Sequence, residues 1–166
     1  MNLNDLPGGS LIFIDANIFI YHFTGLSIEC RSLLERVERK EVRALTGAHV
    51  VLEVLHRMMM IEAVSKALIT PGQPAKKLKQ HPGVIQKIGD YNRCPYEIRR
   101  IGARILPVTS RQIRDSEAMR ANFGLMTNDS VTAAMMFSQG VAYLASLDSD
   151  LSRVPGLVLC RPTDLP

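Results

Sequence analysis

The chain has 166 residues, of which 46% are hydrophobic and 22% charged, with a formal net charge of +4. This length and balance fit one folded domain with a sizeable core and exclude a disordered chain. No apolar stretch approaches the ~20 residues that cross a membrane, and residues 1–7 do not resemble a secretory signal. We therefore expect a single domain over residues 1–166, cytoplasmic and without a membrane segment.

The first half of the chain predicts two short strands and three helices. The apolar run Leu11–Ile14 follows Pro7-Gly8-Gly9-Ser10 and predicts a buried strand. The expected elements after it are a helix from Asn17 to Phe23, a helix from Ser27 to about Lys40, a strand at 42–45 and an apolar helix from 47 to about 69.

The second half continues the alternation. Pro71, Pro74 and Pro82 predict short helices or loops. Beyond them we expect a helix at 95–102, a strand at 105–108, a helix opened by Thr109 or Ser110, a helix at 129–138, and strands at 141–145 and 157–160. Strands alternating with helices indicate a three-layer α/β fold, with a mainly parallel central sheet flanked by helices and a helical extension at about 70–104.

The positive charge is concentrated in this middle region. Residues 71–104 contain eight Lys or Arg and two acids, so the rest of the chain sums to −2. A basic segment beside an acidic centre suits a polyanionic substrate, although a solubilising surface explains the charge equally well. The candidate nucleic-acid contacts are Lys76, Lys77, Lys79, Arg99 and Arg100.

Acidic residues recur where apolar runs end. Asp15 follows the first strand, and Asn17 could cap the next helix or hold Asp15 in place. Asp148 and Asp150 follow the strand at 141–145, where Ser146 could orient Asp148. Ligands bind beyond the carboxyl ends of parallel strands, and acids crowded there would repel one another unless a cation such as Mg²⁺ or Mn²⁺ neutralised them.

Two further acids lie on predicted helices. Glu53 interrupts a nearly all-apolar helix, where a buried pair with Arg57 is the structural alternative. The spacing of His49, Glu53 and His56 could also bind zinc, but it is not the His-Glu-x-x-His pattern. Asp129 opens the helix at 129–138, where capping alone would explain an Asp.

The acidic motifs, taken in order, resemble those of the PIN domain family. They are Phe13-Ile14-Asp15-Ala16-Asn17, Val51-Leu52-Glu53-Val54, Thr127-Asn128-Asp129-Ser130 and Ser146-Leu147-Asp148-Ser149-Asp150. The resemblance is closest to the VapC-like ribonuclease toxins and spans about residues 11–160. Residues 70–104 depart from it, since they exceed the middle region of the compact toxins.

The resemblance implies a metal-dependent endoribonuclease that hydrolyses RNA, with an antitoxin as a protein partner. Asp15, Glu53, Asp129 and Asp148 match the catalytic acids that would bind Mg²⁺ or Mn²⁺. Asn17, Ser146 and Asp150 match accessory positions, and Ser146 stands where Thr is more frequent. The apolar run Met58-Met59-Met60-Ile61 suggests a homodimer, although such runs more often belong to a core.

Several other classes fit less well. A haloacid-dehalogenase-type phosphohydrolase needs an acid where Asn17 stands, and neither a P-loop nor a dinucleotide-binding glycine motif is present. Cys30, Cys94 and Cys160 match neither a disulfide framework nor a zinc pattern and are expected to be free thiols. A catalytically inactive PIN-like protein that binds RNA or acts as a scaffold is the remaining alternative, although such a protein tends to lose one or more of the four acids.

Overall fold

A computed structural model describes residues 1–165. Five parallel strands form one sheet in the order β3-β2-β1-β4-β5. The strands are β1 (Leu11–Ile14), β2 (Arg43–Gly47), β3 (Arg104–Leu106), β4 (Tyr143–Ala145) and β5 (Val158–Cys160). The central strand β1 is fully buried from Ile12 to Ile14, as its continuous apolar run predicts for a parallel sheet covered on both faces.

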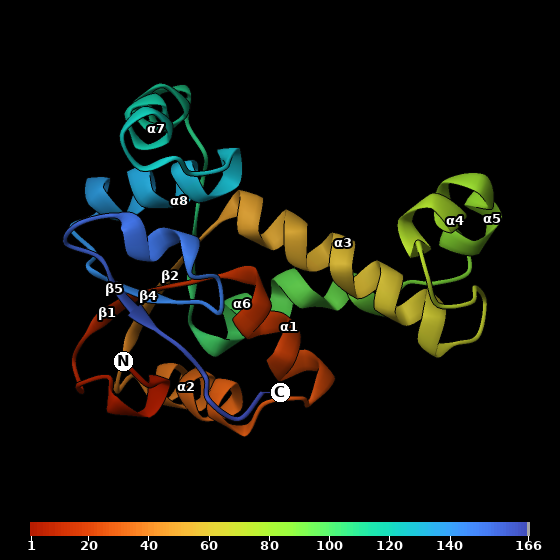
Figure 1. The fold of residues 1–166 in the computed structure, drawn as a ribbon. Coiled ribbons are helices and arrows are strands. Elements are labelled where there is room, and N and C mark those ends of the chain that lie inside the picture. Colours follow the sequence, from red (N-terminus) through yellow and green to blue (C-terminus); the bar gives the residue numbers. More distant parts are fainter. Residues whose placement is uncertain (166) are drawn as a thin grey trace.

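Helices lie on both faces of this sheet (Figure 1). They are α1 (Ala16–Thr24), α2 (Ile28–Glu38), α3 (Ala48–Ser65), α4 (Pro74–Gln80), α5 (Pro82–Ile85), α6 (Cys94–Ile101), α7 (Ser110–Phe123) and α8 (Thr127–Ser138). Three 3₁₀ segments, η1 (Leu3–Asp5), η2 (Asp90–Arg93) and η3 (Asp150–Arg153), complete the elements. The predicted three-layer α/β fold with a parallel sheet is confirmed.

Local sequence signals set several of the helix ends. Ser27 accepts a hydrogen bond from the backbone N–H of Cys30 and starts α2, as predicted. Thr109 and Gln112 form a reciprocal capping box at the start of α7. Gly25 ends α1 in the left-handed conformation, which a residue without Cβ adopts at little cost.

The long helix α3 carries a small lobe at its far end (Figure 1). Its first turns bury Val50, Val51 and Val54 in the main core. Its last turns pack with α4 and α5 in a second, separate apolar core. The buried members of that core are Met60, Ala63, Ile69, Leu78 and Ile88, with Met59 packed against them.

This second core bears on two of the sequence-based expectations. The helix α3 ends at Ser65 rather than near residue 69, because the chain reverses at Ala67 (φ 53°) and folds Ile69 back into the lobe. Met59 and Met60 pack inside the lobe, so the methionine run supplies core and gives no support for a homodimer, which stays a prediction.

The C-terminal segment is tied to the start of α2. Asp164 accepts hydrogen bonds from the backbone N–H groups of Ile28 (2.6 Å) and Glu29 (3.0 Å) and from the Ser27 hydroxyl (2.7 Å). A carboxylate at this helix end satisfies free N–H groups and favours the helix dipole. All three cysteines are buried free thiols, as predicted. None of the described helices combines the length and apolar character needed to span a bilayer.

Candidate active site and metal centre

The register of the parallel sheet brings Asp15 and Ser146 together. Ile14 of β1 lies opposite Ala145 of β4, so the residues that follow them leave the same edge of the sheet side by side. The Asp15 N–H donates to the Ala145 carbonyl at 3.0 Å and fixes this junction. Side chains 131 positions apart in the sequence therefore meet at the carboxyl end of the strands.

Asp15 is held by three hydrogen bonds. Its Oδ1 accepts from the Ala16 N–H (2.7 Å), which makes Asp15 itself the cap of α1. Its Oδ2 accepts from Ser146 Oγ (2.6 Å) and from Asn17 Nδ2 (2.8 Å). Asn17 thus holds Asp15 rather than capping the helix, and Ser146 orients Asp15 while also accepting the N–H of Asp148 (3.0 Å).

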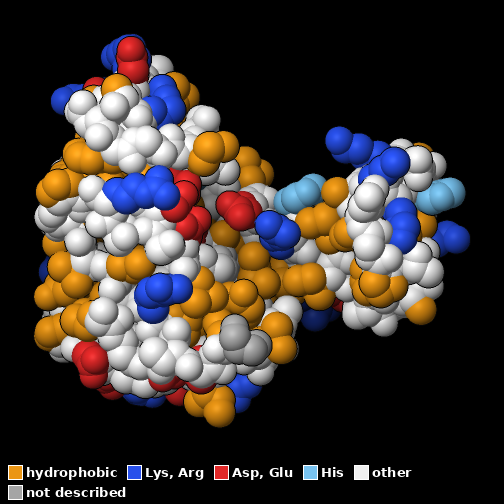
Figure 2. All heavy atoms as spheres, viewed as in Figure 1, with side chains coloured by type: hydrophobic (Ala, Val, Ile, Leu, Met, Phe, Trp, Pro, Cys, Tyr) orange, Lys and Arg blue, Asp and Glu red, His pale blue; other side chains and the backbone are white. Residues whose placement is uncertain are grey.

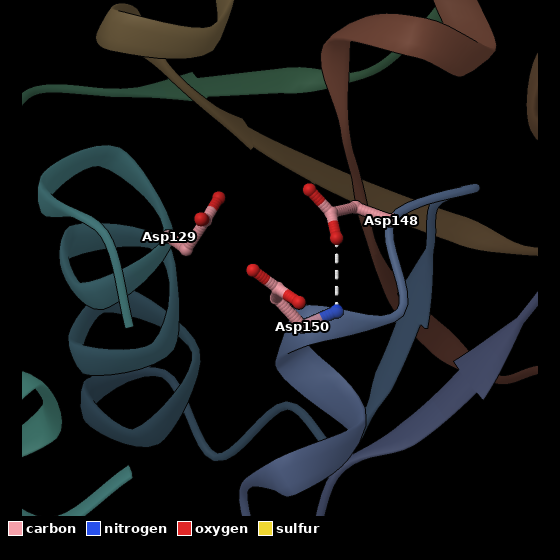
Figure 3. Close-up of side chains that lie close together, drawn as sticks. All are labelled: Asp129, Asp148 and Asp150. Atoms are coloured by element: carbon pink, nitrogen blue, oxygen red, sulfur yellow. Dashed lines mark hydrogen bonds between the residues drawn. The ribbon is translucent and has the colours of Figure 1, made fainter. Parts of the chain in front are cut away.

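Asp129, Asp148 and Asp150 converge across a gap between two elements (Figure 3). Each offers a carboxylate oxygen, and the three oxygens lie within 4.8 Å of one another. Asp148 accepts the N–H of Asp150 at 2.8 Å, and Arg153 pairs with Asp150 at 2.6 Å. Asp150, which the sequence places in an accessory role, is therefore part of the closest acidic group.

The sequence left open a helix-capping role for Asp129 and a buried pair with Arg57 for Glu53. Residues 1–165 contain neither interaction. Helix α8 begins at Thr127, with Met126 at its cap, so Asp129 is in the third helical position and does not cap it. Glu53 is half-buried on α3, and within residues 1–165 it forms neither a hydrogen bond nor an ion pair with Arg57. Both carboxylates are left available to a ligand.

The four predicted acids line one cavity of about 670 Å³. Figure 2 shows acidic side chains at one end of a hollow between the main body and the lobe, with apolar side chains along its floor. The cavity is bounded by Asp15, Asn17, Glu53, Asp129 and Asp148 at the acidic end, and the remaining wall comes from α1, α3 and Pro74.

Burial and crowding raise the pKa values of Asp15, Glu53 and Asp129. Burial is the largest cause in each case, since it disfavours the charged form. The pKa of Asp129 rises to about 6, with the charges of Asp148 and Asp15 adding to the effect of burial. The pKa values of Asp15 and Glu53 are also raised, although the Ser146 hydrogen bond opposes the rise at Asp15.

The donor set fits a hard divalent cation. Mg²⁺ and Mn²⁺ prefer carboxylate oxygens, and a positive ion among these groups would relieve their mutual repulsion. The described residues contain one group of three or more potential metal ligands, and it is Asp129, Asp148 and Asp150. His49, Glu53 and His56 do not form such a group: His49 Nε2 instead lies 2.9 Å from the Thr132 hydroxyl.

Comparison with known proteins agrees with this geometry. The family model described as "PIN domain" matches residues 12–157. The chain belongs to the PIN domain family. A relative, ribonuclease VapC2 of Methanocaldococcus jannaschii, is 29% identical over 143 residues, which cover 86% of this chain and 88% of that protein.

Several solved structures share this fold at low sequence identity. A chain of VapBC2 from Rickettsia felis, crystallised with promoter DNA, aligns with a TM-score of 0.57 at 15% identity, covering 91% of this chain and 98% of that one. VapC20 of Mycobacterium tuberculosis, described as a toxin that cleaves the sarcin–ricin loop, gives 0.59 at 14% identity, covering 91% and 99%. The family resemblance seen in the acidic motifs is confirmed.

The basic residues predicted to contact RNA fall in two places. Lys76, Lys77 and Lys79 lie on α4 of the lobe. Arg100, on α6 beside Arg99, pairs with Glu38 (2.7 Å) and Glu97 (2.8 Å) and lines a cavity with Leu11 and Arg43. Leu11 and Arg43 begin their strands, so Arg100 lies at the sheet edge opposite the acids.

Two lining residues were not singled out from the sequence as parts of a site. Tyr21 lies on α1, one turn after Asn17, and Arg57 lies one turn after Glu53 on α3. The helical spacing of four residues is the signal that could have found them, because it places each on the same face as an acidic-site residue.

Proposed function

We propose that this PIN domain protein is a metal-dependent endoribonuclease that hydrolyses phosphodiester bonds in RNA. The observation that carries the proposal is the convergence of Asp15, Glu53, Asp129 and Asp148 on one cavity, with Asp150 beside them. The ribonuclease name of the relative from Methanocaldococcus jannaschii supports the same reaction. An inactive scaffold would have no evident need to keep these repelling acids together.

The chain would hold Mg²⁺ or Mn²⁺ through Asp129, Asp148 and Asp150, with Asp15 and Glu53 on the adjoining wall. When bound, such an ion supplies Lewis acidity, which neutralises charge on phosphoryl oxygens and acidifies water. Asn17 and Ser146 fix the Asp15 carboxylate in one orientation before substrate arrives. Arg153 screens part of the negative charge of Asp150.

The lobe would attract the RNA backbone. Residues 67–89 contain four Lys and no Asp or Glu, and three of those lysines are on α4. Lys76 and Lys79 are exposed, whereas Lys77 donates to the Thr70 and Pro71 carbonyls. Contacts from such cations to phosphates would supply affinity without sequence choice. Arg99 and Arg100 are not among these cations, because they lie on α6, where Arg100 pairs with Glu38 and Glu97 at the opposite edge of the sheet.

A nuclease assay with a matched pair of variants tests the reaction. In Mn²⁺, the wild-type protein should cut RNA internally, EDTA should stop cleavage, and Asp129→Asn should lower the rate by at least ~100-fold. Asp115→Asn is the control, because Asp115 is an exposed acid on α7 whose one ion pair within residues 1–165 is with Arg111. Binding of RNA without cleavage by the wild type would support the scaffold alternative instead.

We further propose that the protein is the toxin of a toxin–antitoxin pair. The solved structures that share its fold include VapBC2 of Rickettsia felis and a toxin–antitoxin complex from Klebsiella pneumoniae. Induced expression of the chain alone should arrest bacterial growth, and Asp129→Asn should abolish the arrest at equal protein level. Equal arrest by both proteins would contradict a toxic ribonuclease activity.

A further inference from the structure

The first turn of α3 is joined to α8 by one side-chain hydrogen bond, which we call the His49–Thr132 link. Nε2 of His49 lies 2.9 Å from Oγ1 of Thr132, between residues 83 positions apart in the sequence. The two helices lie side by side at this point (Figure 1). Within residues 1–165, no other hydrogen bond and no ion pair connects α3 to α8. The polar contact between these helices therefore depends on this pair.

The chain before α3 makes room for the His49 ring. The ring folds back over Gly47, so closely that a Cβ on Gly47 would lie 2.5 Å from Nδ1 of His49 and closer still to its Cε1. Real Cβ atoms do not approach other atoms to less than 3.0 Å. Gly47 itself is extended (φ −99°), a conformation open to any residue. The missing Cβ thus serves the ring and not the backbone.

This burial determines which ring nitrogen carries the proton. Nδ1 of His49 is buried against Gly47 and has no hydrogen-bond partner within residues 1–165. A buried N–H without an acceptor is rarer in proteins than a buried acceptor without a donor, so the proton belongs on Nε2. Burial also lowers the pKa of His49, which keeps the ring neutral near neutral pH. The Nε2–H group therefore donates to the Thr132 hydroxyl.

The link lies one helical turn from an acid on each helix. Glu53 follows His49 by four residues on α3. Asp129 precedes Thr132 by three residues on α8. Residues at these spacings share a helix face, and both acids line the acidic cavity. Because Glu53 forms no hydrogen bond or ion pair within residues 1–165, its separation from Asp129 is set by how the two helices lie.

We propose that the His49–Thr132 link positions Glu53 relative to Asp129, so that the two helices hold their carboxylates at a fixed separation before a metal ion binds. This inference rests on the proposed metal-dependent function and adds two positioning residues to it. His49 is then a tie between helices and not a ligand. It acts on the metal centre only through the carboxylates one turn away.

Conservative substitutions separate this role from ordinary stability. Thr132→Val removes the hydroxyl from a side chain of almost the same shape, and Thr132→Ser keeps the hydroxyl. His49→Ala removes the ring, whereas His49→Gln offers an amide N–H at about the reach of Nε2. Ser27→Ala is the control, because it removes a buried hydroxyl that caps α2, a helix that does not line the acidic cavity.

The link predicts a specific pattern of rates. The kcat of Mn²⁺-dependent cleavage should fall by about 10- to 100-fold in Thr132→Val and in His49→Ala, with little change in KM. The double variant should fall no further than either single variant, because all three lack the same bond. Thr132→Ser and His49→Gln should stay close to the wild type. Ser27→Ala should keep the wild-type kcat even where its melting temperature falls as far.

Two readouts need no cleavage. In a titration followed by electron paramagnetic resonance, Thr132→Val should bind Mn²⁺ about 10-fold more weakly than the wild type, and Thr132→Ser should restore the affinity. In the metal-free protein, ¹⁵N NMR should show a protonated Nε2 and a bare Nδ1 for His49, identified by the loss of its signals in His49→Gln. Thr132→Val should shift the Nε2 signal.

Gly47→Ala tests the link without altering either partner. The added Cβ should push the ring away from Thr132 and lower the Mn²⁺ affinity as Thr132→Val does. In a His49→Ala background the same substitution should have no further effect, because no ring is left to displace. A loss of affinity that is as large in that background would contradict the assigned role of the ring.

Three further results would overturn the inference. They are wild-type Mn²⁺ affinity in both Thr132→Val and His49→Ala; losses that multiply in the double variant, which would mean that the two residues act separately; and an equal loss of kcat in Ser27→Ala, which would assign the effect to stability. RNA that stays uncut by a wild type that binds Mn²⁺ would instead overturn the ribonuclease proposal, while the resonance and NMR readouts still decide on the link.

Discussion

The hydroxyl of Ser146 donates to Oδ2 of Asp15 across 2.6 Å, between residues that follow neighbouring strands. This bond stabilises the charged carboxylate and lowers its pKa, against the larger effect of burial. It also fixes which way the carboxylate points. Ser146, whose side chain is fully buried, thereby sets the orientation and the pKa of Asp15, which lines the proposed metal centre.

We predict that Ser146→Ala reduces Mn²⁺-dependent cleavage by roughly 10- to 100-fold, the usual effect of losing a partner of a metal-binding carboxylate. Without the hydroxyl, the pKa of Asp15 rises further, so the acid limb of the pH–rate profile should move to higher pH. Ser146→Thr keeps the hydroxyl and should retain the wild-type profile. A wild-type rate and profile in Ser146→Ala, at equal circular dichroism, would contradict the role assigned to this bond.

Metal binding should appear as thermal stabilisation that depends on the same acids. A ligand that binds only the folded state stabilises it by RT ln(1 + [L]/Kd), which is about 2.7 kcal/mol at a hundred times Kd. Mn²⁺ should therefore raise the melting temperature of the wild type and of Asp115→Asn, and have little effect on Asp148→Asn. A melting temperature of the wild type that does not change with Mn²⁺ would count against the metal centre.

In EDTA, Asp129 should make the folded protein less stable at neutral pH. Its pKa is 3.8 in an ordinary environment and about 6 in the fold, so folding disfavours its charged form. The penalty is absent below pH 3.8, grows between there and about pH 6, and is complete above it. Asp129→Asn should therefore exceed the wild type in stability at pH 7.5 by an amount on the order of 1–2 kcal/mol.

Chemical denaturation of both proteins in EDTA at pH 7.5 and 5.0 measures this difference. The gap between wild type and Asp129→Asn should be smaller at pH 5.0, because Asp129 is then largely protonated in the folded state. A gap that is unchanged or larger at pH 5.0 would show that repulsion and burial at Asp129 are not its cause.

Glu62 should hold the lobe to α3. Its carboxylate accepts the N–H groups of Gly89 (3.0 Å) and Tyr91 (2.9 Å) and the ammonium of Lys66 (2.7 Å), while only 8% of its side chain is exposed. Glu62→Gln should cost about 1–3 kcal/mol, because an amide cannot accept all of these bonds. Limited proteolysis should then cut residues 66–93 faster than in the wild type.

Glu97, whose side chain keeps 42% of its surface exposed and pairs with Arg100, provides the control, and Glu97→Gln should cost at most about 1 kcal/mol. The pKa of Glu62 is lowered to about 2 by these hydrogen bonds, despite burial. Its contribution is therefore complete above about pH 4.5 and is lost as the pH falls toward 2. Unchanged proteolysis of the lobe in Glu62→Gln would contradict the anchoring role.

The sequence was sufficient to predict the elements with clear local signals. The apolar run of β1 and the start of α2 at Ser27 are local features, and each lies where it was expected. The three-layer architecture followed from the order of strands and helices. Asp15, Glu53, Asp129 and Asp148 were selected by their motifs, and the structure places all four around one cavity.

The features that the sequence did not predict depend on contacts between distant segments. The early end of α3 follows from the way Ile69 folds back into the lobe, which no local pattern of α3 encodes. Asp150 joins Asp129 because the loop after β4 faces the start of α8. The position of Arg100 at the opposite edge of the sheet depends on the packing of α6 beside α2.

The pairing of β1 with β4 has a consequence for how the protein unfolds and loses activity on heating. Successive side chains of a strand point to opposite faces, so a slip of one residue between these strands would turn Asp15 away from Ser146 and move Phe13 to the other face of the sheet. The alignment of Asp15 with Ser146 is thus enforced by β1, whose residues Ile12, Phe13 and Ile14 are fully buried. Thermal inactivation and melting of the central sheet should coincide in a single transition.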